Sequence, residues 1–404
     1  MISFKPFKST YLFLFLFLNF QLISCAQNSQ LKIKKLKLET GAARTNLYLH
    51  LLKGKKVAVV ANQTSVIFKA PRGKSLQTKH LVDSLISLNV NVKKVFAPEH
   101  GFRGKADAGE VIKDGFDKKT GLPIVSLYGK NKKPSAAQLK GIDIVIFDIQ
   151  DVGARFYTYI SSLHYVLEAC AEAKIKVIIL DRPNPNAHYI DGPVLERAHT
   201  SFVGMHPVPV VYGMTIGEYG KMVNGEKWLQ DGIQCDLTII PLAHYTRETP
   251  YSLPIRPSPN LPNDKSINLY PSLCFFEGTN VSAGRGTEMQ FQIYGSPFLD
   301  KTAFSFTPQA NEGAKYPKYK NKRCFGEDLR MTENRNKLDL SFLIQAYQQS
   351  ASKAFFNTFF RKLAGTEKLQ QQIEEGVSEL AIRKTWEPGL KAFKLIRRPY
   401  LIYK

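Results

Sequence analysis

The chain has 404 residues, of which 44% are hydrophobic and 22% charged, and its formal net charge is +22. A chain of this length and composition can bury a full core, which excludes a disordered protein, and we expect it to divide into two domains. The charge favours anionic partners. Because the sequence has no nucleic-acid-binding motif, we predict no nucleic-acid partner.

The N-terminus predicts an export signal, because a basic start precedes an apolar run over 11–20 that is too short to span a membrane. The following Leu22-Ile23-Ser24-Cys25 resembles a bacterial lipobox. We therefore predict a signal peptide over 1–24, a lipid anchor on the cysteine, and a polar tether over 25–45. Ala26 after the cysteine favours, by resemblance to known sorting rules, the outer membrane with the protein facing the periplasm. The alternative is an ordinary signal peptide with an incidental cysteine.

The next part of the chain alternates between apolar runs and helical periodicity, which is typical of an α/β protein with a parallel sheet. The apolar runs predict strands over 55–61, 92–96, 124–128, 142–147 and 176–180. Helical spacing predicts helices over 80–88, 135–139 and 161–173. The first strand is not followed by GxGxxG spacing, so we predict no nicotinamide or flavin cofactor.

Beyond about residue 200 the pattern changes, because proline-rich turns and short segments replace the alternation. Residues 338–380 are predicted to be mostly helical, with an interruption near Gly365.

Polar groups follow four of the predicted strands. Asn62, Glu99 and Asp181 each come just after a strand, and Asp148 and Asp151 follow another. Right-handed βαβ connections put these strand ends on one edge of the sheet, where open α/β sheets bind ligands. Carboxylates that crowd together repel one another unless they share protons, bind cations or hold a polar ligand. We therefore predict a functional site at this edge.

Seven longer motifs occur in order along the chain. They are NQTS at 62–65, PEHGFRG at 98–104, DIQDVGARFYTY at 148–159, LDRPNP at 180–185, YGMTIGE at 212–218, PSPNLP at 257–262 and FEGTNVSAGRGT at 276–287. Together they resemble the NamZ-like exo-β-N-acetylmuramidase family, formerly a domain of unknown function. One departure is Met289-Gln290-Phe291, where the family pattern leads us to expect a proline before the phenylalanine.

The resemblance implies a Rossmann-like parallel-sheet catalytic domain, over 46–198, followed by a smaller C-terminal α/β domain over 199–404. It places the active site in the cleft between them. The implied activity is release of terminal N-acetylmuramic acid from the non-reducing end of peptidoglycan fragments, by cleavage of a β-1,4 linkage, during cell-wall turnover and recycling.

Glycoside hydrolysis needs an acid that protonates the leaving oxygen and a group that stabilises or attacks the oxocarbenium-like centre. We predict Glu99 as the acid. The candidates for base or nucleophile are Asp148, Asp151 and Glu277, and attack by the substrate's own acetamido oxygen is a further possibility. Spacing in the sequence leaves retention and inversion open, because it does not give the separation of the carboxyl groups.

A guanidinium is the natural partner of the lactyl carboxylate that distinguishes N-acetylmuramic acid from N-acetylglucosamine. Arg103, Arg155 and Arg285 lie inside the motifs and are the candidates, each with a structural salt bridge as its alternative role. The other predicted substrate-binding residues are Asn62, His100, Gln150, Tyr157, Asp181 and Asn280. For Asp181 the alternative role is to cap the turn before Pro183.

Two other functions stay open. One is a metal-dependent cell-wall hydrolase or deacetylase, and its candidate ligands are His100, Asp148, Asp151 and Asp181. The sequence lacks the close histidine clusters of such sites, and we predict no metal and no other cofactor. The other is a glycan-binding lipoprotein without catalytic activity. The sequence also leaves open whether the later cysteines form disulfides, namely Cys170, Cys235, Cys274 and Cys324.

Overall fold

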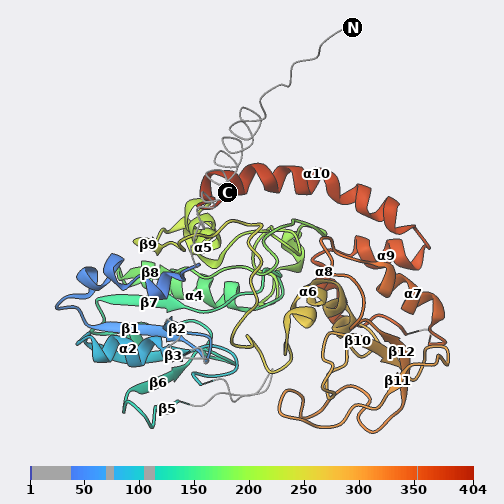
Figure 1. Ribbon diagram of the computed structural model, residues 1–404, viewed down its shortest axis with the longest axis horizontal. Coiled ribbons are helices and arrows are strands. Elements are labelled where there is room, and N and C mark those ends of the chain that lie inside the picture. Colours follow the sequence, from blue (N-terminus) through green and yellow to red (C-terminus); the bar gives the residue numbers. More distant parts are fainter. Residues whose placement is uncertain (2–37, 70–76, 104–113, 353) are drawn as a thin grey trace. The chain divides into compact units, whose positions relative to one another are not determined.

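The computed structural model describes residue 1 and residues 38–69, 77–103, 114–352 and 354–404 (Figure 1). The predicted signal peptide, Cys25, most of the tether and Gly104 of PEHGFRG lie outside the described residues. Residues 38–404 form one structural unit, and this unit contains all of the elements described below.

A seven-stranded sheet dominates the first part of this unit (Figure 1). Its order is β5-β6-β4-β1-β7-β8-β9, and neighbouring strands are parallel except for β5, which runs antiparallel to β6. The strands are β1 (Val57–Ala61), β4 (Val92–Ala97), β5 (Gly115–Phe116), β6 (Pro123–Ser126), β7 (Ile144–Asp148), β8 (Lys176–Leu180) and β9 (Leu237–Ile240). The parallel strands, counted in chain order, lie as 3-2-1-4-5-6, which is the doubly wound topology of Rossmann-like proteins. The predicted α/β class is confirmed.

The central strands β1 and β7 are buried along their whole length, which explains why both read as continuous apolar runs. Helices accompany the sheet, namely α2 (Leu81–Ser87), α3 (Ala136–Leu139), α4 (Tyr159–Glu172) and α5 (Ile216–Gly225). A hairpin of β2 (Val66–Lys69) and β3 (Gln77–His80) follows β1. The sheet extends beyond the predicted domain boundary at residues 198 and 199, because β9 pairs with β8.

The second part of the unit contains a small antiparallel sheet surrounded by helices. Its strands, in order, are β10 (Ile293–Ser296), β12 (Cys324–Asp328) and β11 (Ser305–Phe306). The helices are α6 (Asp264–Leu273), α7 (Ser341–Gln349), α8 (Phe359–Ala364), α9 (Lys368–Glu374) and α10 (Glu379–Arg397). The predicted interruption is confirmed, since Gly365 ends α8 in the left-handed conformation with φ 72°.

Short 3₁₀ segments complete the described structure. They are η1 (Gly41–Ala43), η2 (Thr45–Leu47), η3 (Leu49–Leu52), η4 (Arg197–His199), η5 (Gln230–Gly232), η6 (Cys274–Gly278) and η7 (Arg398–Tyr400).

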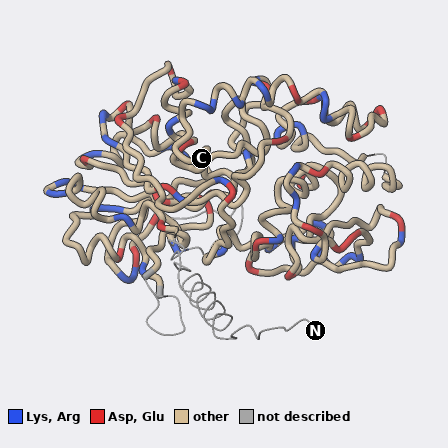
Figure 2. Tube along the Cα trace, turned by 45° about the horizontal axis from the view of Figure 1, so that its top comes forward, with Lys and Arg blue, Asp and Glu red and all other residues tan. Residues whose placement is uncertain are grey.

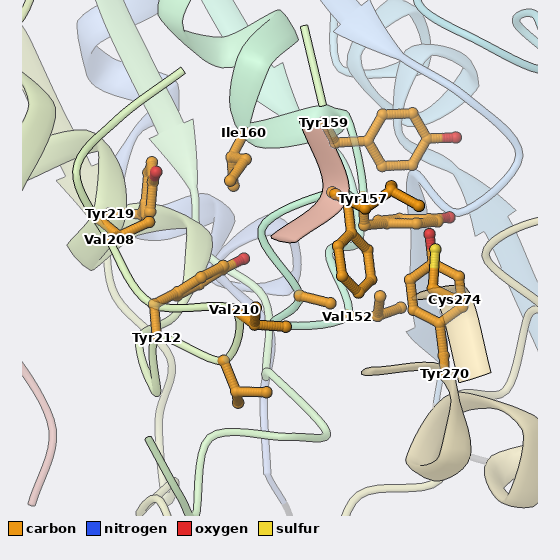
Figure 3. Close-up of a cluster of buried hydrophobic side chains, with 14 of the residues drawn as sticks. Val152, Tyr157, Tyr159, Ile160, Val208, Val210, Tyr212, Tyr219, Tyr270 and Cys274 are labelled. Atoms are coloured by element: carbon orange, nitrogen blue, oxygen red, sulfur yellow. The ribbon is translucent and has the colours of Figure 1, made fainter. Parts of the chain in front are cut away.

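The two parts share one apolar core. A single cluster of buried side chains contains Phe147 and Leu163 of the first part together with Phe276 and Phe360 of the second. Figure 3 shows a section of this cluster, in which the Tyr157 side chain of the first part lies close to those of Tyr270 and Cys274 of the second. The surfaces of both parts that meet here are therefore fixed against each other by burial of apolar area.

The C-terminal end of the chain returns to the large sheet. Helix α10 runs from the small-sheet region back towards α5 (Figure 1). The Tyr400 hydroxyl donates to Glu226 Oε1 at 2.7 Å, and the Tyr403 hydroxyl donates to Asp181 Oδ2 at 2.6 Å.

Lys and Arg residues occur along most of the described chain, around the large sheet and on the later helices alike (Figure 2). The positive charge is thus spread over many segments. Among the described helices, we find none with the length and apolar character needed to cross a bilayer.

Candidate active site

A cavity of about 260 Å³ lies where the two parts meet, and residues of both parts line it. We call it the Glu99 cavity. Of the residues predicted for the site, five line it, and they are Glu99, His100, Tyr157, Glu277 and Arg285. The structure therefore brings together residues that are far apart in the sequence, and two of the five are carboxylic acids.

Glu99 reaches the cavity from a tight turn at the carboxyl end of β4. The Gly101 N–H donates to the Pro98 carbonyl at 3.0 Å, and both His100 and Gly101 have left-handed φ values, of 70° and 76°. A left-handed residue other than glycine costs about 1 kcal/mol or more and is typical of functional sites, where the surrounding structure holds it. This local geometry turns Glu99 and His100 towards the second part of the molecule.

Two hydroxyl groups hold the Glu99 carboxyl group in place. The Tyr128 hydroxyl donates to Oε1 at 3.0 Å, and the Thr158 hydroxyl donates to Oε2 at 2.8 Å. Thr158 is the N-cap residue of α4, but its side chain makes no capping hydrogen bond to the helix. Its hydroxyl serves Glu99 instead, so the start of α4 positions the carboxyl group.

Glu277 lies in η6, and Arg285 follows in the glycine-rich stretch after it. Arg285 Nε donates to Glu277 Oε1 at 2.9 Å, and the guanidinium carbon lies 5.1 Å from the centroid of the Phe291 ring. The side chains of both members of the pair are about one quarter exposed, at 25% for Arg285 and 27% for Glu277. The pair is thus partly desolvated yet accessible to a ligand.

Two glycines give the loop its shape on either side of Arg285. Gly284 has φ 80° and Gly286 has φ 79°, in the left-handed region that favours glycine. A Cβ atom at Gly286 would also come within 2.6 Å of the Gln309 carbonyl oxygen and of Pro317. This loop is therefore a rigid support that directs Arg285 at Glu277.

The electrostatic surroundings keep Glu277 ionised. Burial acts to raise the pKa of the Glu277 carboxyl group, but the positive charges of Arg285 and Lys318 outweigh it, and the pKa lies below its ordinary value. Burial likewise acts to lower the pKa of Arg285, and the Glu277 carboxylate overcomes this and raises it. Glu277 is therefore suited to stabilise positive charge or to attack, and unsuited to donate a proton.

Aromatic side chains form part of the wall of this cavity. The Tyr270 ring packs edge to face against Tyr157, at 5.9 Å between centroids, and against Phe291, at 4.9 Å. Tyr157 donates its hydroxyl hydrogen to the Pro257 carbonyl at 2.8 Å. Such a wall presents flat apolar surface to a ligand, and Tyr157 and Tyr270 can be followed in Figure 3.

Further polar residues that the sequence did not single out also line the cavity, among them Tyr128, Thr158 and Asn260. The Asn260 Nδ2 group donates to the Gly313 carbonyl, and its buried Oδ1 atom accepts no hydrogen bond from the described residues. Thr158 and Asn260 lie inside the motifs DIQDVGARFYTY and PSPNLP, and their place in these motifs could have indicated a role in the site. Nothing in the spacing of the sequence pointed to Tyr128.

Asp148 lies elsewhere, in the core beneath the sheet edge. Its oxygens accept from Arg182 Nε at 2.6 Å and Arg182 Nη2 at 2.8 Å, and both side chains are fully buried or nearly so. The carboxylate is therefore neutralised by a bidentate ion pair and does not line the Glu99 cavity.

The other two aspartates at this edge are also buried away from the cavity. Asp151 Oδ2 accepts from the Tyr212 hydroxyl and, at 2.7 Å, from the Gly153 N–H, and burial raises the pKa of Asp151 to about 6. Asp181 accepts from Thr215 Oγ1 at 2.7 Å as well as from Tyr403, and burial raises its pKa to about 6. These contacts connect Asp181 to the C-terminal end of the chain.

Asn62 and Gln150 hold the loops behind the cavity. Asn62 Nδ2 donates to the Tyr159 hydroxyl at 2.8 Å. Gln150 Nε2 donates to the carbonyls of Asp151, at 2.8 Å, and Pro183, at 2.6 Å.

Of the three predicted arginines, only Arg285 lines the cavity. Arg155 is fully buried, and burial lowers its pKa to about 9. Its Nη1 and Nη2 groups donate to four backbone carbonyls at 2.7 to 2.9 Å, those of Pro193, Val208, Leu363 and Ala364. Arg103 pairs with Asp117 at 2.7 Å and with Asp83 at 3.4 Å. Asn280 is also outside the cavity, and its Nδ2 group lies 3.5 Å from Ser350 Oγ.

The candidate metal ligands are dispersed in the same way. Within the described ranges, no three His, Cys, Asp or Glu side chains come together as a metal site would require. Cys170, Cys235, Cys274 and Cys324 are all buried free thiols in the described structure.

An α/β protein whose cavity holds one hydroxyl-bound glutamate, one arginine-paired glutamate and an aromatic wall has the parts of a glycoside hydrolase. Residues 57–265 match the family model described as exo-β-N-acetylmuramidase NamZ, N-terminal, and residues 268–403 match the C-terminal model of the same family. The chain belongs to this family.

Individual relatives agree with this assignment. The chain is 38% identical over 404 residues to the peptidoglycan β-N-acetylmuramidase NamZ of Bacillus subtilis (strain 168), with 92% of each chain covered. Two crystal structures of DUF1343 family proteins from Bacteroides fragilis NCTC 9343 are similar to it. One is 45% identical with a TM-score of 0.83, the other 27% identical with a TM-score of 0.75, and each match covers 91% of this chain and 99% of the other.

Proposed function

We propose that this protein is an exo-acting glycoside hydrolase that releases terminal N-acetylmuramic acid from the non-reducing end of peptidoglycan fragments. The observation that carries the proposal is the convergence of Glu99 and the Glu277–Arg285 pair on one cavity. Membership of the exo-β-N-acetylmuramidase family over residues 57–403, apart from two residues between the models, supports it.

In this proposal Glu99 is the proton donor. Its proton passes to the glycosidic oxygen as the bond from that oxygen to C1 breaks, and the bonding electron pair leaves with the oxygen. The Glu277 carboxylate, kept ionised by Arg285 and Lys318, stabilises the positive charge that develops at C1. The reaction is complete when C1 carries the oxygen of a water molecule and Glu99 has recovered a proton.

Arg285 is the residue that we propose to bind the lactyl carboxylate. Its Nε–H is engaged by Glu277, and a guanidinium has further N–H donors on its two Nη atoms. Arg155 and Arg103 are engaged with buried carbonyls and with aspartates, respectively. An arginine that faces the cavity and already carries a carboxylate partner can bind a second one at the other edge of its plane.

The direct test uses the purified protein without residues 1–25 and the disaccharide of N-acetylmuramic acid β-1,4-linked to N-acetylglucosamine. We expect free N-acetylmuramic acid to appear with wild-type protein and not with Glu99→Gln. A protein that binds the disaccharide but releases no sugar would instead be a glycan-binding lipoprotein. Loss of the wild-type activity on chelation would favour the metal-dependent alternative.

For the N-terminal segment we propose a lipid anchor on Cys25 and, because Ala26 follows the cysteine, a location at the outer membrane facing the periplasm. The sequence Leu22-Ile23-Ser24-Cys25 supports this proposal. Labelled fatty acid should be incorporated into the wild-type protein in cells and not into Cys25→Ser. Incorporation that persists in the variant would contradict the proposal.

A further inference from the structure

A second cavity, of about 430 Å³, adjoins the first. We call it the Tyr316 cavity. Glu277 and Arg285 line both cavities, so this ion pair stands at the boundary between them. The remaining wall of the Tyr316 cavity comes from residues 282–283 and from the segment 313–318.

Tyr316 itself is 91% exposed. A single exposed aromatic residue is ordinary on a protein surface and needs no explanation. This one differs because it stands in the wall of a cavity that reaches the proposed catalytic pair. An aromatic ring offers a flat apolar face, which is the surface that stacks against the apolar face of a sugar ring.

The segment that carries Tyr316 is fixed at both ends. The Gly313 carbonyl accepts from Asn260 Nδ2. Beyond the tyrosine, Lys318 Nζ donates to three backbone carbonyls at 2.6 to 3.0 Å, those of Phe276, Thr279 and Val281. Tyr316 is thus held on a rigid support next to Glu277, as a preformed ligand subsite requires.

An exo-acting hydrolase must place the bond to be broken between a subsite for the terminal sugar and a subsite for the sugar that leaves. Glu99 and the aromatic wall belong to the first cavity, and Glu277 lies at the boundary with the second. With C1 of the terminal sugar beside Glu277, the next sugar lies on the far side of the ion pair.

We infer that the Tyr316 cavity binds the leaving N-acetylglucosamine residue and that Tyr316 stacks on its ring. This inference rests on the proposed function, because it assumes cleavage of a muramyl glycoside. It assigns to Tyr316 a role in recognising the leaving sugar, with no part in the chemistry at C1.

The test compares two substrates that differ only in the leaving group. One is the muramyl-glucosaminide disaccharide, and the other is the methyl β-glycoside of N-acetylmuramic acid, whose leaving methanol is too small to reach Tyr316. Replacing Tyr316 by Ala should lower kcat/KM for the disaccharide about tenfold and leave the methyl glycoside within about twofold of wild type. Tyr316→Trp should keep the disaccharide activity, because the flat face is retained.

Met331→Ala is the matched control, since Met331 is a large apolar residue that is 94% exposed and does not line either cavity. This variant should leave kcat/KM unchanged for both substrates. Equal losses for both substrates with Tyr316→Ala, or no loss for either, would overturn the inference while leaving the hydrolase intact. Wild-type protein that releases no N-acetylmuramic acid from either substrate would instead overturn the proposed function.

Discussion

Replacement of Asp151 by Asn separates a structural role of this residue from the catalytic role that the sequence alone allowed. Asp151 is buried, it does not line the Glu99 cavity, and burial raises its pKa from 3.8 to about 6. A carboxyl group whose pKa is higher in the folded protein than in the unfolded chain binds more protons in the folded state. Its contribution to stability is therefore fully present below pH 3.8 and is lost as the pH rises through about 6.

The magnitude follows from the same values. The shift of about two pKa units corresponds to a loss of about 3 kcal/mol at neutral pH, since one unit is about 1.4 kcal/mol. Between pH 4 and pH 7 most of this loss, about 2 kcal/mol, should appear in the wild type and be absent from Asp151→Asn. Any effect of the side-chain amide in Asp151→Asn on stability that does not depend on pH, such as an altered hydrogen bond, cancels when the stabilities at the two pH values are subtracted.

The assay is urea unfolding of both proteins at pH 4 and pH 7, with turnover measured at a temperature where both are folded. We expect the variant to gain about 2 kcal/mol relative to wild type on going from pH 4 to pH 7, and to retain hydrolysis. A folded Asp151→Asn protein without activity would show that Asp151 takes part in the chemistry. If wild type and variant differ in stability by the same amount at both pH values, the pKa of the Asp151 carboxyl group is not raised in the folded protein.

Three further predictions concern the supports of the site. Thr158→Val should lower kcat about tenfold with little change in KM, and Thr158→Ser should restore it, because only the hydroxyl reaches Glu99; equal kinetics for Val and Ser would contradict this. Arg285→Ala should impair muramides far more than N-acetylglucosaminides. Arg155→Ala should instead lower the free energy of unfolding by about 4 kcal/mol without changing sugar preference, because it removes four hydrogen bonds to buried backbone carbonyls. A change of sugar preference with Arg155→Ala would reverse these assignments. Gly286→Ala should destabilise the fold by about 2 kcal/mol or more in urea unfolding, since the left-handed backbone and the nearby Gln309 carbonyl leave no room for a Cβ atom; unchanged stability would contradict the loop geometry.

The large sheet was predictable because parallel strands that are buried on both faces consist mainly of apolar residues. The strand at 57–61 is a continuous apolar run, and those at 92–97 and 176–180 are apolar apart from Lys93, Lys94 and Lys176. The observed bounds of all three lie within two residues of the predicted ones. The strand β9 was missed because its run at 237–240 is short and partly exposed. The small antiparallel sheet was missed for a related reason, since its three strands have only two to five residues each.

The site was predictable only in part, because polar strand ends serve two purposes. Glu99 lies just beyond β4 and lines the cavity, whereas Asp148 ends β7, on the other side of β1 in the sheet, and is neutralised by Arg182. Both have the same local pattern in the sequence. What distinguishes them is a contact over 34 positions of the chain, which spacing does not reveal.

The second part of the site depends on tertiary contacts in a different way. The motif around Arg285 is rich in glycine, and the φ values of Gly284 and Gly286 explain why glycines are needed there. That Arg285 pairs with Glu277 and lines the same cavity as Glu99 follows from packing of the two parts. Tyr316 carried no motif signal, and its place in a cavity emerged only from the fold.

The most direct test of the central claim, that Glu99 is the proton donor on a muramyl glycoside, varies the leaving group. A 2,4-dinitrophenyl leaving group needs no proton, whereas the N-acetylglucosamine of the disaccharide does. Glu99→Gln should lower kcat for the disaccharide by about 10³-fold and lower kcat for the dinitrophenyl muramide far less. The control is Glu172→Gln, on the exposed side of α4, which should leave kcat for both substrates unchanged. Full activity of Glu99→Gln on the disaccharide, or equal losses on both substrates, would show that Glu99 is not the proton donor.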